Sequence, residues 1–221
     1  MGKKVPAGIG ALALLNPTML LELGLMVGLT ELAVAIIAFI RARTLGLDWL
    51  RVFGAGVFLL SMAQLLCKVI GRGLLHLPFT YPIGVPFKTA GLVLVLYSLL
   101  KAIDHPKTKM LTVLVVLAGI YFLVGSLLAF TVHKIFALWE FHLPHLIFLV
   151  LGPFIIGYFI FEAYMETRDR SALFFSLGLW IYSLASLIVI LGVQITHINI
   201  ALTYTLIARA LAMVIVLLGT I

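Results

Sequence analysis

Charged residues are scarce in this chain of 221 residues, because Asp, Glu, Lys and Arg make up only 10% of it, whereas 64% is hydrophobic. A soluble domain usually contains about 25% charged residues, so this chain cannot cover a water-facing surface with polar groups. The scarcity excludes a soluble enzyme domain, a disordered chain and a solenoid. It indicates an integral membrane protein.

Cysteine is almost absent too, and the single Cys67 excludes an internal disulfide and any Cys-x-x-Cys redox or zinc site. The few amides are Asn16, Asn199, Gln64 and Gln194. Such a low amide content suggests a thermophilic, prokaryotic source. The sequence also lacks the common catalytic motifs: intramembrane Asp pairs, Gly-x-Ser-x-Gly elbows, His-Glu-x-x-His runs and phosphate-binding glycine loops. We therefore do not expect an enzyme.

Long apolar runs take up most of the chain, and a crossing of a bilayer needs about 20 such residues. The windows of that length are 18–40, 50–71, 83–103, 109–132, 143–165, 172–194 and 200–220. The run after Lys3 and Lys4 is too long for a signal peptide, so we expect it to remain as the first span. The sequence therefore predicts an all-α, polytopic protein of the cell membrane, with one domain of seven transmembrane helices over 1–221.

Basic loop residues predict the orientation of these spans. The loops after the first, third and fifth spans carry Arg41, Arg43, Arg51, Lys101, Lys107, Lys109, Arg168 and Arg170. The loops after the second, fourth and sixth carry only Arg72 and Lys134. By the positive-inside rule, the N-terminus lies outside and the C-terminus in the cytoplasm. With basic residues spread in this way, we expect no nucleic-acid partner.

Residues 53–66 of the second span resemble residues 175–188 of the sixth, at an offset of 122, with Phe, Gly, Ser, Ala and Leu at like positions. At an offset of 121, Lys88 of the third span matches Arg209 of the seventh. These matches predict a parallel repeat with halves 18–103 and 143–220, joined by a linker helix at 109–132. The alternative is chance matching of small residues that serve helix packing.

This layout of three, one and three helices resembles both the SWEET transporters and the rhodopsin-like plan, in helix number and orientation alone. The Pro-Gln signature of the SWEET relatives is absent, since Pro153 has no partner proline in the first span. A retinal protein needs a lysine in its seventh span, where the only charge here is Arg209. We therefore assign no family and expect no retinal.

Glu31 and Arg209 lie near mid-membrane on the first and seventh spans, which adjoin if the helices close into a ring. Ionisable groups at this depth normally face the bundle interior, so we expect an ion pair between the two. It is either a structural lock or the floor of a pocket where Arg209 binds an anionic group bidentately.

Glu22, Lys68 and Lys88 lie nearer the outer surface, about 6–8 Å down by helical rise. They either snorkel to the headgroups or join Gln64, Glu31 and Arg209 in one outward-opening pocket.

Histidines gather on the outer side, together with Glu140. The set considered as metal ligands is His76, His133, Glu140, His142 and His145. We expect the histidines to be solvated at the membrane interface. Three alternatives stay open: zinc or copper binding by the imidazoles, a haem near the outer surface, and an acid-pH sensor.

These residues leave three functions open. The first is transport or binding of a small anionic solute or lipid headgroup in the polar pocket. The second is a sensor or receptor module that signals through a partner or a cytoplasmic domain outside this sequence. The third is a structural or electron-transfer subunit of a membrane complex. The expected partners are the lipid bilayer, a small ligand, and either a second copy or another membrane subunit. Ligand identity and oligomeric state are not fixed by the sequence.

Overall fold

The computed structural model describes residues 17–76, 80–110, 147–195 and 198–220, with separate helical residues between 112 and 124. This part of the chain is helical and contains no strand. Helices suit these apolar runs because backbone N–H and C=O groups in hydrocarbon must be satisfied within their own segment.

Six helices in the described part are long and apolar enough to cross a membrane. They are Met19–Leu45, Asp48–Gly71, Ile83–Ala102, Leu149–Thr167, Arg170–Ile188 and Leu202–Thr220. Each matches a predicted span, so six of the predicted spans are confirmed as helices of spanning length. The fourth, 109–132, lies largely outside the described residues, although a shorter apolar helix covers Thr108–Leu117.

The first half contains α2 (Pro17–Leu45), α3 (Asp48–Met62), η1 (Ala63–Leu74) and α4 (Thr80–Ala102). Helix α2 stops before Gly46, whose φ of 68° is the left-handed conformation in which a helix often ends. The second predicted span is α3 followed directly by η1, a π-helix. The sequence did not predict this change of helix type, which often accompanies a functional site.

The second half contains η3 (Ile147–Leu151), α7 (Gly152–Thr167), α8 (Arg170–Ile195) and α9 (Ile198–Thr220). Pro153 lies at the start of α7, directly after η3, and because it has no N–H it cannot bond to a carbonyl of that preceding turn. Arg168 ends α7 at a φ of 58°. Asp169 then caps α8 by accepting a hydrogen bond of 2.9 Å from the backbone N–H of Ser171.

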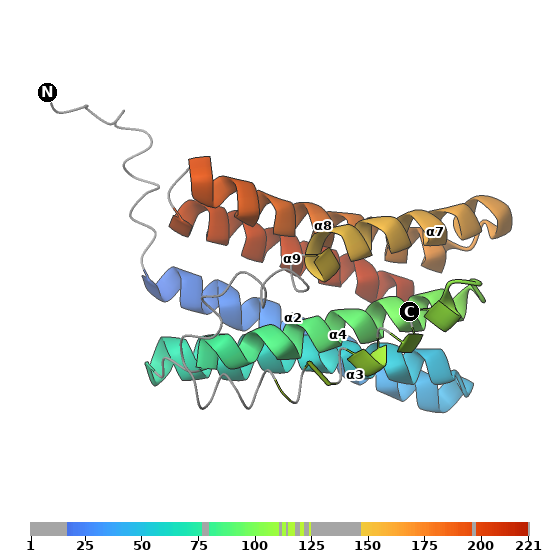
Figure 1. Ribbon diagram of the computed structural model, residues 1–221, viewed down its shortest axis with the longest axis horizontal. Helices are drawn as coiled ribbons and strands as arrows, with labels where there is room; N and C mark the ends of the chain where they lie inside the picture. Colours follow the sequence, from blue (N-terminus) through green and yellow to red (C-terminus); the bar gives the residue numbers. More distant parts are fainter. Residues whose placement is uncertain are drawn as a thin grey trace, which may run out of the picture.

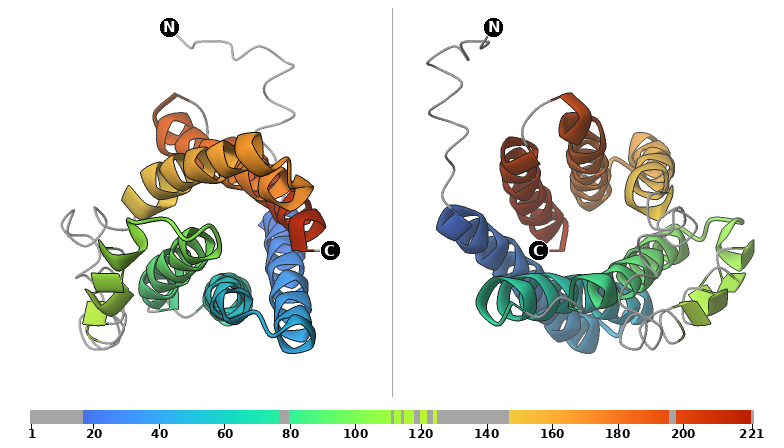
Figure 2. Two further views of the ribbon diagram at one scale, coloured as in Figure 1. Left: turned by 90° about the vertical axis from the view of Figure 1, so that its right-hand side faces the viewer. Right: turned by 60° about the vertical axis from the view of Figure 1, so that its left-hand side comes forward.

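The two halves lie against each other as two groups of three helices (Figure 1). Helix α2 packs against α9, and α4 packs against α7 and η3, so the six long helices close into a ring (Figure 2). The expected contact between the first and last spans is thus confirmed. We call the end at which α2, α4 and α9 begin the expected outer end.

Equivalent positions make equivalent contacts in the two halves. The Ser61 hydroxyl of α3 donates to the Gly28 carbonyl of α2 at 2.9 Å, and the Ser183 hydroxyl of α8 donates to the Val150 carbonyl of η3 at 2.8 Å. Donor and acceptor are both shifted by 122 residues, the offset at which the two sequences match.

Two glycines repeat this correspondence at the next helix contact. A Cβ atom on Gly56 would lie 2.7 Å from the Gly91 carbonyl oxygen, and one on Gly178 would lie 3.0 Å from the Ala212 carbonyl oxygen. Each glycine therefore allows α3 to approach α4, or α8 to approach α9, more closely than a side chain would permit. The two glycines are again 122 residues apart, and the residues whose carbonyl oxygens they approach, Gly91 and Ala212, are 121 apart.

Candidate functional site

Four polar side chains of the predicted pocket are buried together with the helix core. Glu31 of α2 and Gln64 of η1 are each 3% exposed, and Lys88 of α4 and Arg209 of α9 are each 6% exposed. Lys68 of η1 is half-buried. Glu31 interacts electrostatically with all three cations, so these residues form one group, which we call the charged cluster.

Arg209 is held by two residues of the neighbouring helix α8. Its Nη2 atom donates to the Ser186 hydroxyl at 3.4 Å, and its Cζ atom lies 5.0 Å from the centre of the Tyr182 ring. Tyr182 and Ser186 are four residues apart and therefore lie on one face of α8. Among the residues that the structure describes, none accepts a hydrogen bond from the buried Nε atom of Arg209, which leaves this atom available for an acceptor.

Glu31 lies on α2, about 21 Å along the helix from Pro17 at 1.5 Å per residue, with its carboxylate facing the same interior. Its Oε2 atom is buried and has no hydrogen-bond partner within the described residues. The three nearby cations attract the charge of this carboxylate, which offsets part of the cost of burying it.

The expected direct ion pair between Glu31 and Arg209 is wrong. Among the residues that the structure describes, the single ion pair within 4.0 Å is Arg51 with Asp48, which are both exposed. Although α2 and α9 are neighbours, the guanidinium of Arg209 contacts Tyr182 and Ser186 of α8, whose ring and hydroxyl both attract a cation.

Two lysines supply the remaining positive charge. Lys88 lies close to Lys68, which the π-helix carries one turn beyond Gln64. Gln64 donates from Nε2 to the Gly24 carbonyl of α2 at 3.4 Å. Two ammonium groups at close range repel each other where no water screens them, so an anion between them would be stabilised.

Lys88 does not snorkel, because only 6% of it is exposed. Glu22, by contrast, is exposed on α2 and does not join the charged cluster. It lies nine residues before Glu31, and nine steps of about 100° place two residues on opposite faces of a helix. When Glu31 faces the interior, Glu22 must therefore face outwards.

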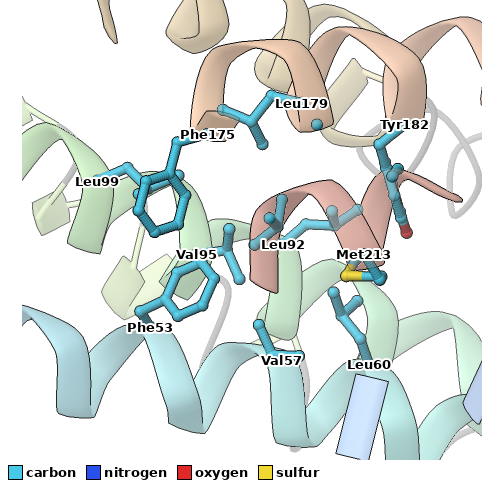
Figure 3. Close-up of a pocket in the computed structure, with 13 residues that line it drawn as sticks. Phe53, Val57, Leu60, Leu92, Val95, Leu99, Phe175, Leu179, Tyr182 and Met213 are labelled. Carbon is cyan, nitrogen blue, oxygen red and sulfur yellow. The ribbon is translucent and has the colours of Figure 1, made fainter. Parts of the chain in front are cut away.

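A small apolar cavity of about 20 Å³ lies between the two halves, next to Tyr182 (Figure 3). Five pairs of residues that match at an offset of 121 or 122 line it: Phe53 with Phe175, Val57 with Leu179, Leu60 with Tyr182, Leu92 with Met213, and Val95 with Val216. Phe53 and Phe175 contact each other edge to face, with ring centres 5.5 Å apart. The cavity has room for about one water molecule.

The predicted metal site falls mostly outside the described residues, where His133, Glu140, His142 and His145 all lie. His76 is exposed just after η1. Within the described part, no group of three or more His, Cys, Asp or Glu residues could hold a metal ion. Metal or haem binding by the outer histidines therefore stays a prediction.

The sequence pointed to four buried members of the charged cluster but not to the contacts of Arg209. Neither Tyr182 nor Ser186 is among the site residues that the sequence predicts. One signal for Ser186 was present, because it is the residue that matches Gln64 at the offset of 122. Matching positions near Lys88 and Arg209 thus carry polar side chains in both halves.

Comparison with known proteins gives no relative for this chain: no family model, curated protein or solved structure matches it.

Proposed function

We propose that this chain is a multi-pass protein of the cell membrane that binds and transports a small anion, at a site between two parallel three-helix repeats. The anion would bind between Lys88 of the first half and Arg209 of the second. The observation that carries the proposal is the burial of Lys88 and Arg209 with the Glu31 carboxylate at this boundary, beside the half-buried Lys68.

The excess of positive charge favours an anionic ligand. Within the described residues, the buried Lys88 and Arg209 both interact electrostatically with one buried carboxylate, that of Glu31. Burying unpaired charge is costly, and charged groups within a membrane normally pair with one another or mark a ligand pathway. An anion would offset the excess. The Nε of Arg209, which has no hydrogen-bond partner in the described part of the chain, suits a planar oxyanion such as nitrate or a carboxylate, because the guanidinium can donate from two nitrogens in one plane.

The matched contacts support the parallel repeat and, with it, transport. The hydrogen bonds of Ser61 and Ser183 are spaced alike, and Lys88 and Arg209 are themselves matched positions. Parallel repeats related by an axis along the membrane normal occur in transporters, where the substrate lies at the repeat interface and the halves rock about it. The small apolar cavity lies at this same boundary.

A free solute is favoured over a lipid headgroup as the ligand. Glu31, Lys88 and Arg209 are buried on every side, whereas a headgroup attached to its acyl chains would need an opening between helices. Extraction of the purified protein followed by mass spectrometry separates the two sources, because a headgroup ligand would copurify as an anionic lipid in a ratio of about one to one.

Nitrate is a suitable probe for the site, in calorimetric titration of the detergent-purified protein and in uptake into proteoliposomes. We expect nitrate to bind and to be taken up, and Arg209→Ala to abolish both. Arg43→Ala, which removes an exposed cation at the end of α2, should behave as the unaltered protein. Binding without uptake would favour the sensor function, and no binding would favour a structural subunit.

A further inference from the structure

Two cations of the charged cluster occupy matched positions in the two halves, whereas its carboxylate has no counterpart in the second half. Lys88 and Arg209 occupy matched positions, and so do Gln64 and Ser186. Glu31 has no acidic counterpart, because the offset of 122 places the buried Pro153 at the matching position. The carboxylate is therefore an addition to one side of a site whose cations are shared between both halves.

Glu31 faces charged or titratable groups from several elements. Lys68 of η1, Lys88 of α4 and Arg209 of α9 attract its charge, and Tyr182 of α8 lies near enough to be affected by it. Helix α3 contributes none at this depth, since its Asp48 and Arg51 pair with each other in an exposed position. No described residue donates a hydrogen bond to Oε2 of Glu31.

An arriving anion competes with this carboxylate. Both are attracted to the same cations, and two negative charges repel strongly in a site from which water is excluded. A proton on Glu31 would remove the repulsion and release the cations to the anion. The protonated carboxyl would also tolerate its apolar surroundings better, because a neutral acid is far cheaper to bury than a carboxylate.

We propose that Glu31 takes up one proton from water when an anion binds between Lys88 and Arg209, so that anion and proton enter the site together. The proposal rests on the proposed function and adds that anion binding is coupled to proton uptake. The carboxylate becomes a carboxylic acid as the anion binds, and no other bond changes. Transport would then be driven by a proton gradient in the same direction as the anion.

Nitrate titration over a series of pH values tests this coupling. By linkage, uptake of one proton makes log Kd rise by up to about one unit per pH unit over the range in which Glu31 changes its protonation on binding, so nitrate binds more tightly in acid. Glu31→Gln imitates the protonated side chain and should give a Kd that no longer varies with pH, near the tight, acidic limit of the unaltered protein. Glu166→Gln, an exposed control on α7, should keep the full slope.

A second measurement covers the case in which Glu31→Gln fails to fold. Nitrate added to the unaltered protein in weak buffer should remove about one proton per bound nitrate from solution, as read by an indicator dye. A Glu31→Gln variant that keeps the full slope, or binding without proton uptake, would overturn the coupling while leaving anion binding intact. Failure of the unaltered protein to bind nitrate at any pH would overturn both proposals.

Discussion

Arg209 differs from the two lysines of the charged cluster in the shape of its charged group. A guanidinium is a planar fork that can hold an oxyanion through two nitrogens, whereas an ammonium acts as a compact point charge. In this protein one edge of the fork is engaged by Ser186 and the ring of Tyr182 covers its face. Its Nε atom is buried and has no hydrogen-bond partner within the described residues, so it can donate to an anion at the site.

Replacing Arg209 by lysine tests this geometry while keeping the charge. We expect Arg209→Lys to weaken nitrate binding about tenfold or more, because a hydrogen bond to a charged group contributes about 1.5–3 kcal/mol. Calorimetric titration gives the Kd, and the melting temperature in detergent should change little. The reciprocal variant, Lys88→Arg, also keeps the positive charge, and we expect its affinity for nitrate to be retained. Equal Kd values for Arg209→Lys and the unaltered protein would show that charge alone suffices.

The burial of four polar residues could be predicted from the sequence, but side-chain direction could be predicted only in part. The burial of Glu31, Lys88, Gln64 and Arg209 follows from the cost of ionisable and polar groups in hydrocarbon. The direction of Arg209 does not, because it depends on Tyr182 and Ser186 of a different helix. The opposite facing of Glu22 and Glu31, by contrast, follows from a spacing of nine residues and was available in the sequence.

The helices themselves were predictable because they are long and apolar, and the six described spans match the predicted windows. The π-helix η1 was not predictable. Its residues include Gln64, Lys68 and Arg72 among apolar ones, but such residues occur in α-helices as well, so the composition does not indicate a change from i→i+4 to i→i+5 bonding. This segment carries Gln64 and Lys68, so part of the site depends on a local geometry that the sequence conceals.

The paired serine contacts allow a test of the repeat at the level of helices. Ser61→Ala and Ser183→Ala each remove one hydrogen bond between helices, which in a membrane contributes about 0.6 kcal/mol on average. If the halves are equivalent, the two variants should lower the melting temperature by similar amounts, and the double variant by the sum. Ser98→Ala is the control, because its hydroxyl bonds to the Val95 carbonyl of its own helix. A marked loss for one serine and none for the other would argue against equivalent halves.

For the whole molecule, the orientation in the membrane remains a prediction from loop charge. It can be tested in a Cys67→Ala background, which removes the only native thiol. A membrane-impermeant maleimide should label Leu75→Cys at the expected outer end in intact cells, and should label Arg43→Cys only after the cells are opened. Both positions are exposed. The reverse labelling pattern would invert the topology.

The central claim, an anion site shared by the two halves, can be examined directly in crystals of the protein grown in bromide. Anomalous scattering locates bromide without reference to any assay of function. We predict a peak between the Lys88 ammonium and the Arg209 guanidinium, within about 4 Å of both, the range of an ion pair. A peak absent from that position, with Arg209 paired directly to Glu31 instead, would contradict the claim and favour a structural lock.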